Sequence, residues 1–236
     1  LLFKKNISII CPSNFILNKA RKSKILKSKK KIKISNTLDR NFWKPLNKSE
    51  CKKKLNINKN KKILLFNMPS ESDDYVKGLD IFVSIINKLN IENLEIKFFG
   101  AHRPKVLNKI KYKSYNFGYI KDNLKLRNLY NSSDLVISTS RFESFGQVIL
   151  EAQTCGVPCI GFKETGLEDI IIDNKTGYLI KNKDINKMIK KINFLLSEKK
   201  NIKFEKKYLE QIHKKFNFLT VGNQHIKFYK RILNEK

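Results

Sequence analysis

The strongest constraint on this chain is a regular alternation of short apolar runs with helical patterns through its middle. Five runs rich in β-branched and aromatic residues have the composition of strands, and they are Lys62–Asn67, Leu94–Phe99, Asp134–Ser138, Pro158–Phe162 and Gly177–Ile180. Apolar strands that alternate with helices are typical of a parallel sheet covered on both faces. The sequence therefore predicts an α/β fold, in which helices cover both faces of a Rossmann-like parallel sheet.

Two segments between these strands have the apolar spacing of amphipathic helices. Residues 77–89 are expected to bury one face made of Leu79, Val83, Ile86 and Leu89. Residues 145–155 are expected to bury Val148, Leu150 and Ala152 in a shorter helix.

The ends of the chain differ from this middle. Residues 1–45 offer two strand-like runs, Ile7–Cys11 and Lys31–Ile34, and then the turn composition of Asn36–Asp39. We interpret 1–45 as a remnant of a preceding domain with its linker, 46–202 as the Rossmann-like domain, and 203–236 as closing helices with an exposed apolar face. The first residue is Leu and no signal-peptide pattern follows it, which favours a cytoplasmic chain that begins inside a longer one.

The charge is lopsided, because 50 Lys and Arg residues face 21 Asp and Glu residues and give a net charge of +29. Such a balance is typical of partners that are nucleic acids or anionic membranes. Arginine forks dominate base recognition, however, and here the excess is almost entirely lysine scattered along the chain. We therefore expect compositional drift and no specific nucleic acid, and keep a basic binding module as an alternative.

Other classes of protein are disfavoured by what the sequence lacks. No apolar run approaches the roughly 18–20 residues that cross a bilayer. The four cysteines, Cys11, Cys51, Cys155 and Cys159, form neither a disulfide framework nor a metal-ligand pattern with the three histidines. We expect a reducing compartment, and no bound metal or cofactor.

The most informative stretch is residues 138–158, where a strand ends, a small polar loop follows, and Gly146 opens a helix. The first amides of that helix have no partner within it, so they can bind an anion such as a phosphate. Glu143 and Glu151 lie eight residues apart, about 12 Å along a helix, so a ligand of nucleoside-diphosphate length could touch both. The alternative is that Glu143 favours a helix start and Glu151 is a solvated side chain.

The pattern Glu-x7-Glu with Phe-Gly inside it and Gly-x-Pro after it resembles the nucleotide-sugar-binding domain of retaining glycosyltransferases of family 4, also called glycosyl transferases group 1. Further matches follow in the family's order, and they are Asn36–Asp39, Lys77–Asp80, Phe117–Tyr119, Gly166–Asp169 and Asp173–Gly177. The resemblance implies the C-terminal half of a two-domain GT-B fold. It also implies retaining, hexosyl-type transfer from a nucleoside-diphosphate sugar to a hydroxyl acceptor, in surface polysaccharide or glycolipid synthesis.

The resemblance also implies roles for individual residues. Glu151 would accept hydrogen bonds from the two ribose hydroxyls, Glu143 would contact the donor sugar, and Lys77 would stabilise the diphosphate as it leaves. Catalysis would therefore depend on Glu143 and Lys77. The donor would also be bound by Ser144, Phe145, Gly146 and Gly166.

Two departures from the family pattern keep other functions open. The family's Gly-Arg at the end of the first strand is replaced by Phe66-Asn67-Met68, and only the last strand and helix of an acceptor-binding domain are recognisable before residue 45. A non-catalytic nucleotide-binding remnant is thus an alternative. Scattered lysines could also hold the chain at the inner face of an anionic membrane, near an acceptor that is a glycan or lipid-linked glycan.

Overall fold

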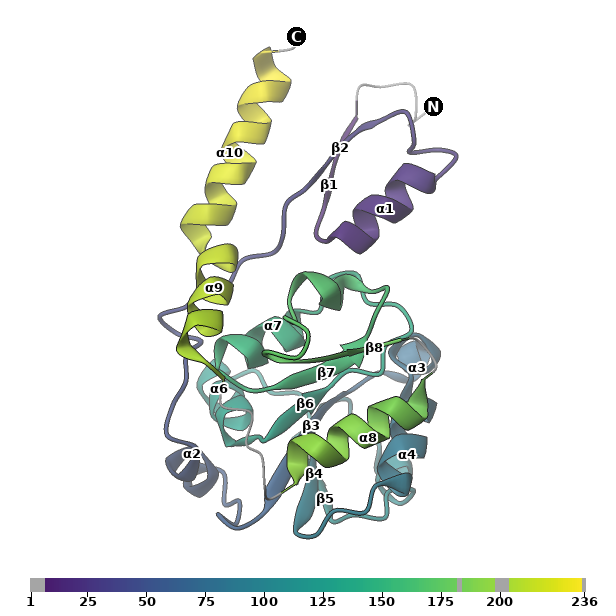
Figure 1. Ribbon diagram of the computed structural model, residues 1–236, viewed down its shortest axis with the longest axis vertical. Helices are drawn as coiled ribbons and strands as arrows, with labels where there is room; N and C mark the ends of the chain where they lie inside the picture. The colour runs from purple at the N-terminus through teal and green to yellow at the C-terminus, as the bar shows by residue number, and fades with distance from the viewer. Residues whose placement is uncertain (1–6, 182–183, 198–203, 235–236) are drawn as a thin grey trace.

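The computed structural model describes residues 7–181, 184–197 and 204–234 (Figure 1). Its main sheet has six parallel strands in the order β5-β4-β3-β6-β7-β8. Their bounds are β3 (Lys62–Met68), β4 (Leu94–Gly100), β5 (Ser114–Asn116), β6 (Leu135–Ile137), β7 (Cys159–Phe162) and β8 (Gly177–Ile180). All five predicted strands are confirmed, and the short edge strand β5 is an addition.

Helices cover both faces of this sheet (Figure 1). One face carries α4 (Leu79–Lys88) and α8 (Ile185–Leu196), which pack on alternate residues of β3 such as Leu64 and Phe66. The opposite face, which includes Leu65, carries α6 (Asn123–Ser132), α7 (Gln147–Thr154) and α9 (Lys206–Phe216). The predicted Rossmann-like α/β architecture is therefore confirmed.

Three short helices complete this part of the chain, and they are α2 (Lys48–Lys54), α3 (Asp74–Lys77) and α5 (Pro104–Leu107). The single helix expected over 77–89 is wrong in one respect, because Gly78 separates α3 from α4. Gly78 has φ +65°, and a Cβ built there would lie 2.1 Å from the Thr139 carbonyl oxygen. A residue with a side chain could not hold this left-handed turn against the strand end.

The buried faces of two helices also differ in detail from the prediction. In α4 the fully buried side chains include Phe82 and Ile85, while the expected Val83 is only partly buried. In α7 the expected Leu150 and Ala152 are buried, but Val148 is partly buried and Ile149 takes its place.

A smaller unit is built from the two ends of the chain. Strands β1 (Ser8–Cys11) and β2 (Lys30–Lys33) pair in parallel around α1 (Asn14–Lys22). Helix α1 packs on one face of this pair, and α10 (Phe218–Asn234) packs on the other through Val221 and Phe228. Figure 1 shows α10 rising away from the main sheet beside this pair.

Helix α10 also carries apolar side chains that face solvent, as expected for the closing helices. The exposed ones are Phe218, Leu219, Ile226, Tyr229 and Leu233. Helix α9, in contrast, belongs to the core of the main sheet through Ile212 and Phe216. The predicted domain boundary at residue 202 lies outside the described residues. Within the described part of the chain, no helix is long and apolar enough to span a bilayer.

The aromatic centre of the core gives a direct test of this packing. Phe82 is 0% exposed and stacks on Phe66 with ring centroids 4.0 Å apart. We expect Phe82→Ala to lower the free energy of unfolding by about 3–5 kcal/mol in urea titrations. The matched variant Tyr119→Ala removes an aromatic ring that is 80% exposed and should change it by less than about 0.5 kcal/mol. Similar losses in both variants would contradict the assigned core.

Candidate donor-binding site

The site forms where strands β3, β6 and β7 end and α7 begins. Gly146 directly precedes α7 and has φ +100°. The Gly146 carbonyl accepts the first hydrogen bond of the helix, from the Leu150 amide at 3.0 Å. The amides of Gln147, Val148 and Ile149 lie ahead of that bond. These three amides therefore point out of the helix at its positive dipole end. The sequence predicts such donors slightly earlier, around Phe145 and Gly146.

A second loop locks this turn in place. Gly166 begins the short helical turn Gly166–Asp169, and its amide donates to the Glu143 carbonyl at 2.7 Å. A Cβ on Gly166 would lie 2.5 Å from the Ser144 carbonyl oxygen and 2.6 Å from the Phe145 Cα. The two loops thus touch backbone to backbone, which only glycine allows at this position.

Phe145 and Ser144 differ in which of their atoms have a partner within the protein. The Phe145 ring is buried and meets Phe216 of α9 at a centroid distance of 5.9 Å, so only its backbone can reach a ligand. The carbonyl of the exposed Ser144 accepts a 2.5 Å hydrogen bond from the Ser13 hydroxyl, at the start of α1. The N-terminal segment therefore lies directly against the predicted donor loop.

Lys77 and Glu143 come together across the site. The Lys77 Nζ lies 2.8 Å from the Glu143 Oε2, although the residues are 66 positions apart. The Thr139 hydroxyl donates to the carbonyls of Lys77 and Gly78 at 3.1 and 2.9 Å, which fixes the end of α3 beside the end of β6. The side chains are 39% and 15% exposed, so the pair can be reached from solvent.

This ion pair borders a cavity of about 190 Å³. Six of the residues that line the cavity are Asn67, Lys77, Ser140, Glu143, Gly146 and Gln147. Two predicted catalytic residues, the opening of α7 and the end of β3 thus share one cavity. It lies at the carboxyl ends of parallel strands, where ligands bind in open α/β sheets.

Glu151 lies one helical turn beyond Gln147 and does not line this cavity. Its Oε2 accepts a hydrogen bond from the Tyr130 hydroxyl at 2.8 Å, and its Oε1 accepts from the Gln147 Nε2 at 3.4 Å. Burial raises the pKa of Glu151, against the two hydrogen bonds, which lower it. Glu151 is therefore a partly buried, oriented carboxylate and not the solvated side chain of the alternative interpretation.

The arginines near the site are already engaged. Arg141 makes a bidentate pair with Asp80 at 2.8 and 2.6 Å, and Arg103 pairs with Asp74. Neither replaces the second cation of the family pattern, and Asn67 lines the cavity at the end of β3. Lys77 is the cation that the structure places at this cavity.

The cysteines behave as core residues. Cys155 and Cys159 are buried, and loss of solvation raises the pKa of both thiols, that of Cys159 to about 12. In the described ranges, no three His, Cys, Asp or Glu side chains are grouped as metal ligands.

Two sets of side-chain contacts were not predicted from the sequence. Tyr130 supports Glu151, and the Asp169 carboxylate accepts hydrogen bonds from the Asn14 amide at 2.6 Å and the Lys33 Nζ at 3.0 Å. These pairs are 21 to 155 positions apart, so no local spacing could reveal them.

The family model of glycosyl transferases group 1 matches residues 47–215. A curated relative, an uncharacterized 41.2 kDa protein in the cps region of Klebsiella pneumoniae, is 32% identical over 117 residues, which are 49% of this chain and 32% of that protein. The matched region thus spans about a third of that relative's length.

Solved structures share the fold. The sucrose-phosphate synthase of Thermosynechococcus elongatus superposes with a TM-score of 0.84 at 20% identity, over 100% of this chain and 60% of that chain. Anabaena HepE, solved in complex with UDP and glucose, superposes with a TM-score of 0.77 at 17% identity, over 94% of this chain and 62% of that chain. The predicted likeness to the C-terminal half of a GT-B fold is confirmed.

The raised pKa of Glu151 predicts an unusual effect on stability. Because the folded state binds this proton more tightly than the unfolded state, ionisation of Glu151 costs stability once the pH rises above the ordinary value of 4.5 and through the raised pKa. We expect Glu151→Gln, which can still accept from Tyr130, to have a higher Tm than the wild type at pH 8. The advantage should shrink as the pH falls toward 4.5.

The matched control is Glu92→Gln, which removes an exposed carboxylate. Its Tm difference from the wild type should stay nearly constant over the same pH range. A constant difference for Glu151→Gln as well would contradict a destabilised carboxylate in the folded state.

Proposed function

The chain belongs to the glycosyl transferases group 1 family, and we propose that it binds a nucleoside-diphosphate sugar at the cavity beside α7 for transfer to a hydroxyl acceptor with retention. The observation that carries this proposal is the convergence of the Lys77–Glu143 pair and the first amides of α7 on one cavity. The complexes of Anabaena HepE with UDP-glucose and with UDP and glucose support the class of donor.

The ion pair suggests how a donor would be received. The Lys77 ammonium and the Glu143 carboxylate form an ion pair at 2.8 Å. A diphosphate at the start of α7 would draw the Lys77 ammonium toward its oxygens, since the helix dipole and the lysine both favour negative charge there. Glu143 would then be free to accept hydrogen bonds from sugar hydroxyls.

The same residues support a route for transfer. In a retaining reaction the bond between the sugar anomeric carbon and the diphosphate oxygen breaks, and the acceptor oxygen bonds to that carbon on the same face. The departing phosphate oxygen takes the acceptor proton. Lys77 would stabilise the charge that grows on the diphosphate, so it should contribute more to turnover than to ground-state binding.

We place this activity in surface polysaccharide or glycolipid synthesis. The competing proposal is a non-catalytic nucleotide-binding chain, favoured by Asn67 in place of the second cation. Nucleotide binding without transfer by the full-length protein would select it.

Binding of the donor nucleotide is the first test. We expect one of UDP, GDP and ADP to raise the Tm of this chain at near-physiological salt, because a ligand that binds only the folded state stabilises it. Absence of a shift with all three would contradict a donor site in this chain.

The role of Lys77 is tested with that nucleotide. Lys77→Met should weaken binding of the diphosphate about tenfold, the order of one charge-assisted hydrogen bond, and that of the monophosphate by less. Lys88→Met, which removes an exposed lysine at the end of α4, is the control and should leave both affinities unchanged. Equal losses for diphosphate and monophosphate would contradict contact with the leaving group.

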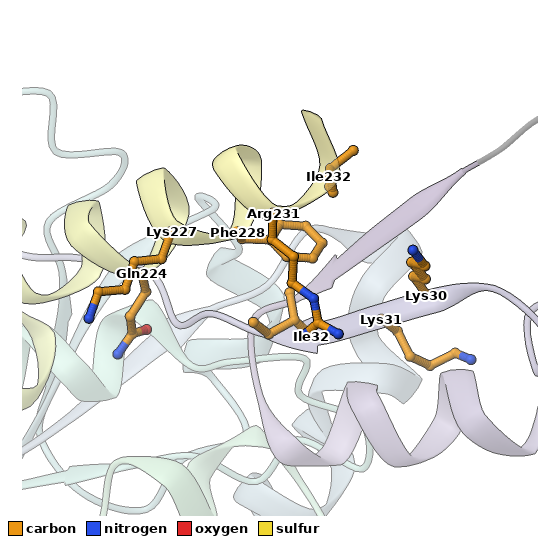
Figure 2. Close-up of a pocket in the computed structure, with 8 residues that line it drawn as sticks. All are labelled: Lys30, Lys31, Ile32, Gln224, Lys227, Phe228, Arg231 and Ile232. Atoms are coloured by element: carbon orange, nitrogen blue, oxygen red, sulfur yellow. The ribbon is translucent and has the colours of Figure 1, made fainter. Parts of the chain in front are cut away.

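We also propose peripheral contact with an anionic membrane through the groove between β2 and α10. Figure 2 shows side chains of both elements at this groove, among them Lys30, Lys31, Lys227 and Arg231 around the apolar Phe228. Basic side chains around apolar surface favour anionic lipid headgroups, with about 1 kcal/mol from each charge near the surface.

Vesicle sedimentation tests this contact. The chain should bind vesicles with 30% anionic lipid and not neutral vesicles, and the double variant Lys227→Glu/Arg231→Glu should lose most of that binding. Lys187→Glu/Lys190→Glu on α8 makes the same charge change outside the groove and serves as the control. Equal loss in the two double variants would indicate a diffuse effect of net charge and contradict the groove as the contact.

A further inference from the structure

Tyr130 is a buried polar side chain that the proposed reaction does not use directly. It is 0% exposed on the inner face of α6, and its hydroxyl donates to the Glu151 Oε2 at 2.8 Å. A hydrogen bond to an ionised acceptor is stronger than one between neutral groups, and in a buried setting it fixes the geometry of both partners. The orientation of the Glu151 carboxylate therefore depends on Tyr130.

The ring of Tyr130 cannot turn away from this position. It meets Trp43 edge-on at a centroid distance of 5.8 Å, and Phe99 at 5.9 Å with an interplanar angle of 86°. Trp43 lies in the segment between β2 and α2, which joins the smaller unit to the main sheet, and Phe99 lies near the end of β4. Both rings are less than 10% exposed. The hydroxyl is thus held toward α7 by packing from two separate elements.

The other oxygen of the carboxylate is held more loosely. The Glu151 Oε1 accepts from Gln147 at 3.4 Å, and the Gln147 side chain accepts in turn from the Asn36 Nδ2 at 3.4 Å. Gln147 lines the cavity. A carboxylate has about four acceptor positions. One of these is occupied by Tyr130 at short range, and the remaining ones can serve a ligand on the side of Gln147.

The family resemblance implies that Glu151 accepts hydrogen bonds from the ribose hydroxyls. We propose that Tyr130 is a positioning residue that holds the Glu151 carboxylate in the orientation this contact needs, and so strengthens the preference for ribonucleoside over deoxyribonucleoside diphosphates. This inference rests on the proposed donor site. Burial raises the pKa of Glu151, and the Tyr130 hydrogen bond opposes this effect by favouring the ionised form of the carboxylate.

The positioning role of Tyr130 is tested with ligands that have or lack the ribose hydroxyls. The affinities of the preferred nucleoside diphosphate and of its 2′,3′-dideoxy counterpart are measured by calorimetry at pH 7.5. The wild type should prefer the ribose form at least tenfold, and Tyr130→Phe should reduce that ratio at least threefold. Affinity for the dideoxy form should stay within twofold, because that ligand never uses Glu151.

Three controls separate positioning from general damage. Tyr112→Phe removes a hydroxyl that donates to the Leu89 carbonyl at 2.9 Å away from the site, and should leave the ratio unchanged. Glu151→Gln should reduce the ratio at least as much as Tyr130→Phe. If Tyr130→Phe does not fold, Trp43→Phe loosens the ring contact and should lower the same ratio by a smaller factor.

The outcomes distinguish this inference from the proposed function. A wild type that binds none of UDP, GDP and ADP overturns the donor site and the inference with it. A wild type that binds the diphosphate, and whose preference for ribose survives Tyr130→Phe unchanged, overturns the positioning role alone. A wild type that binds ribose and dideoxy forms equally overturns the contact of Glu151 with ribose.

Discussion

The backbone contact between two loops is the constraint on which the site depends. Gly166 approaches Ser144 and Phe145 so closely that a Cβ would overlap them at 2.5–2.6 Å. The Gly166 amide donates a hydrogen bond to the Glu143 carbonyl, and this bond fixes the position of the loop that carries Glu143. Because the loop after β7 thereby braces the loop after β6, the opening of α7 is held rigidly at the sheet edge. Anion binding by helix amides needs this rigidity, since a mobile turn would lose entropy on each binding event.

The charge at the cavity differs from the charge of the whole chain. Although the chain carries a net charge of +29, Lys77 is the one basic residue among the described residues that line the cavity, and its ammonium is paired with Glu143. Nearby arginines are neutralised by Asp80 and Asp74. Long-range positive potential can attract an anionic donor, but the local selectivity comes from the exchange of one ion pair for another. The net charge of the chain therefore affects how fast an anion approaches, while the ion pair at the cavity affects which anion binds.

The sheet, its parallel direction and the main loops could be predicted from the sequence, because apolar periodicity and glycine placement act over short distances. Lys77 and Glu143 were also predicted, through the resemblance to a family, and the structure brings them together. Strand β5 was missed because it is a three-residue edge strand, Ser114–Asn116, without an apolar run. The hydrogen bond that orients Glu151 was missed because its donor, Tyr130, lies on another helix. Packing between distant elements leaves no trace in local spacing.

The segment before residue 45 contributes more to the site than its position suggests. Ser13 holds the Ser144 carbonyl, Asn14 and Lys33 hold the buried Asp169 carboxylate, and Trp43 holds the ring of Tyr130. Ser144 directly follows the cavity-lining Glu143, Asp169 ends the turn whose first amide binds the Glu143 carbonyl, and Tyr130 supports Glu151. A rotation of the β1–β2 unit would have to break the buried hydrogen bonds of Asp169, and an unpaired buried carboxylate is costly. The placement of the β1–β2 unit and the shape of the donor site are therefore coupled. A shift of this unit would change the contacts that hold the two loops of the donor site.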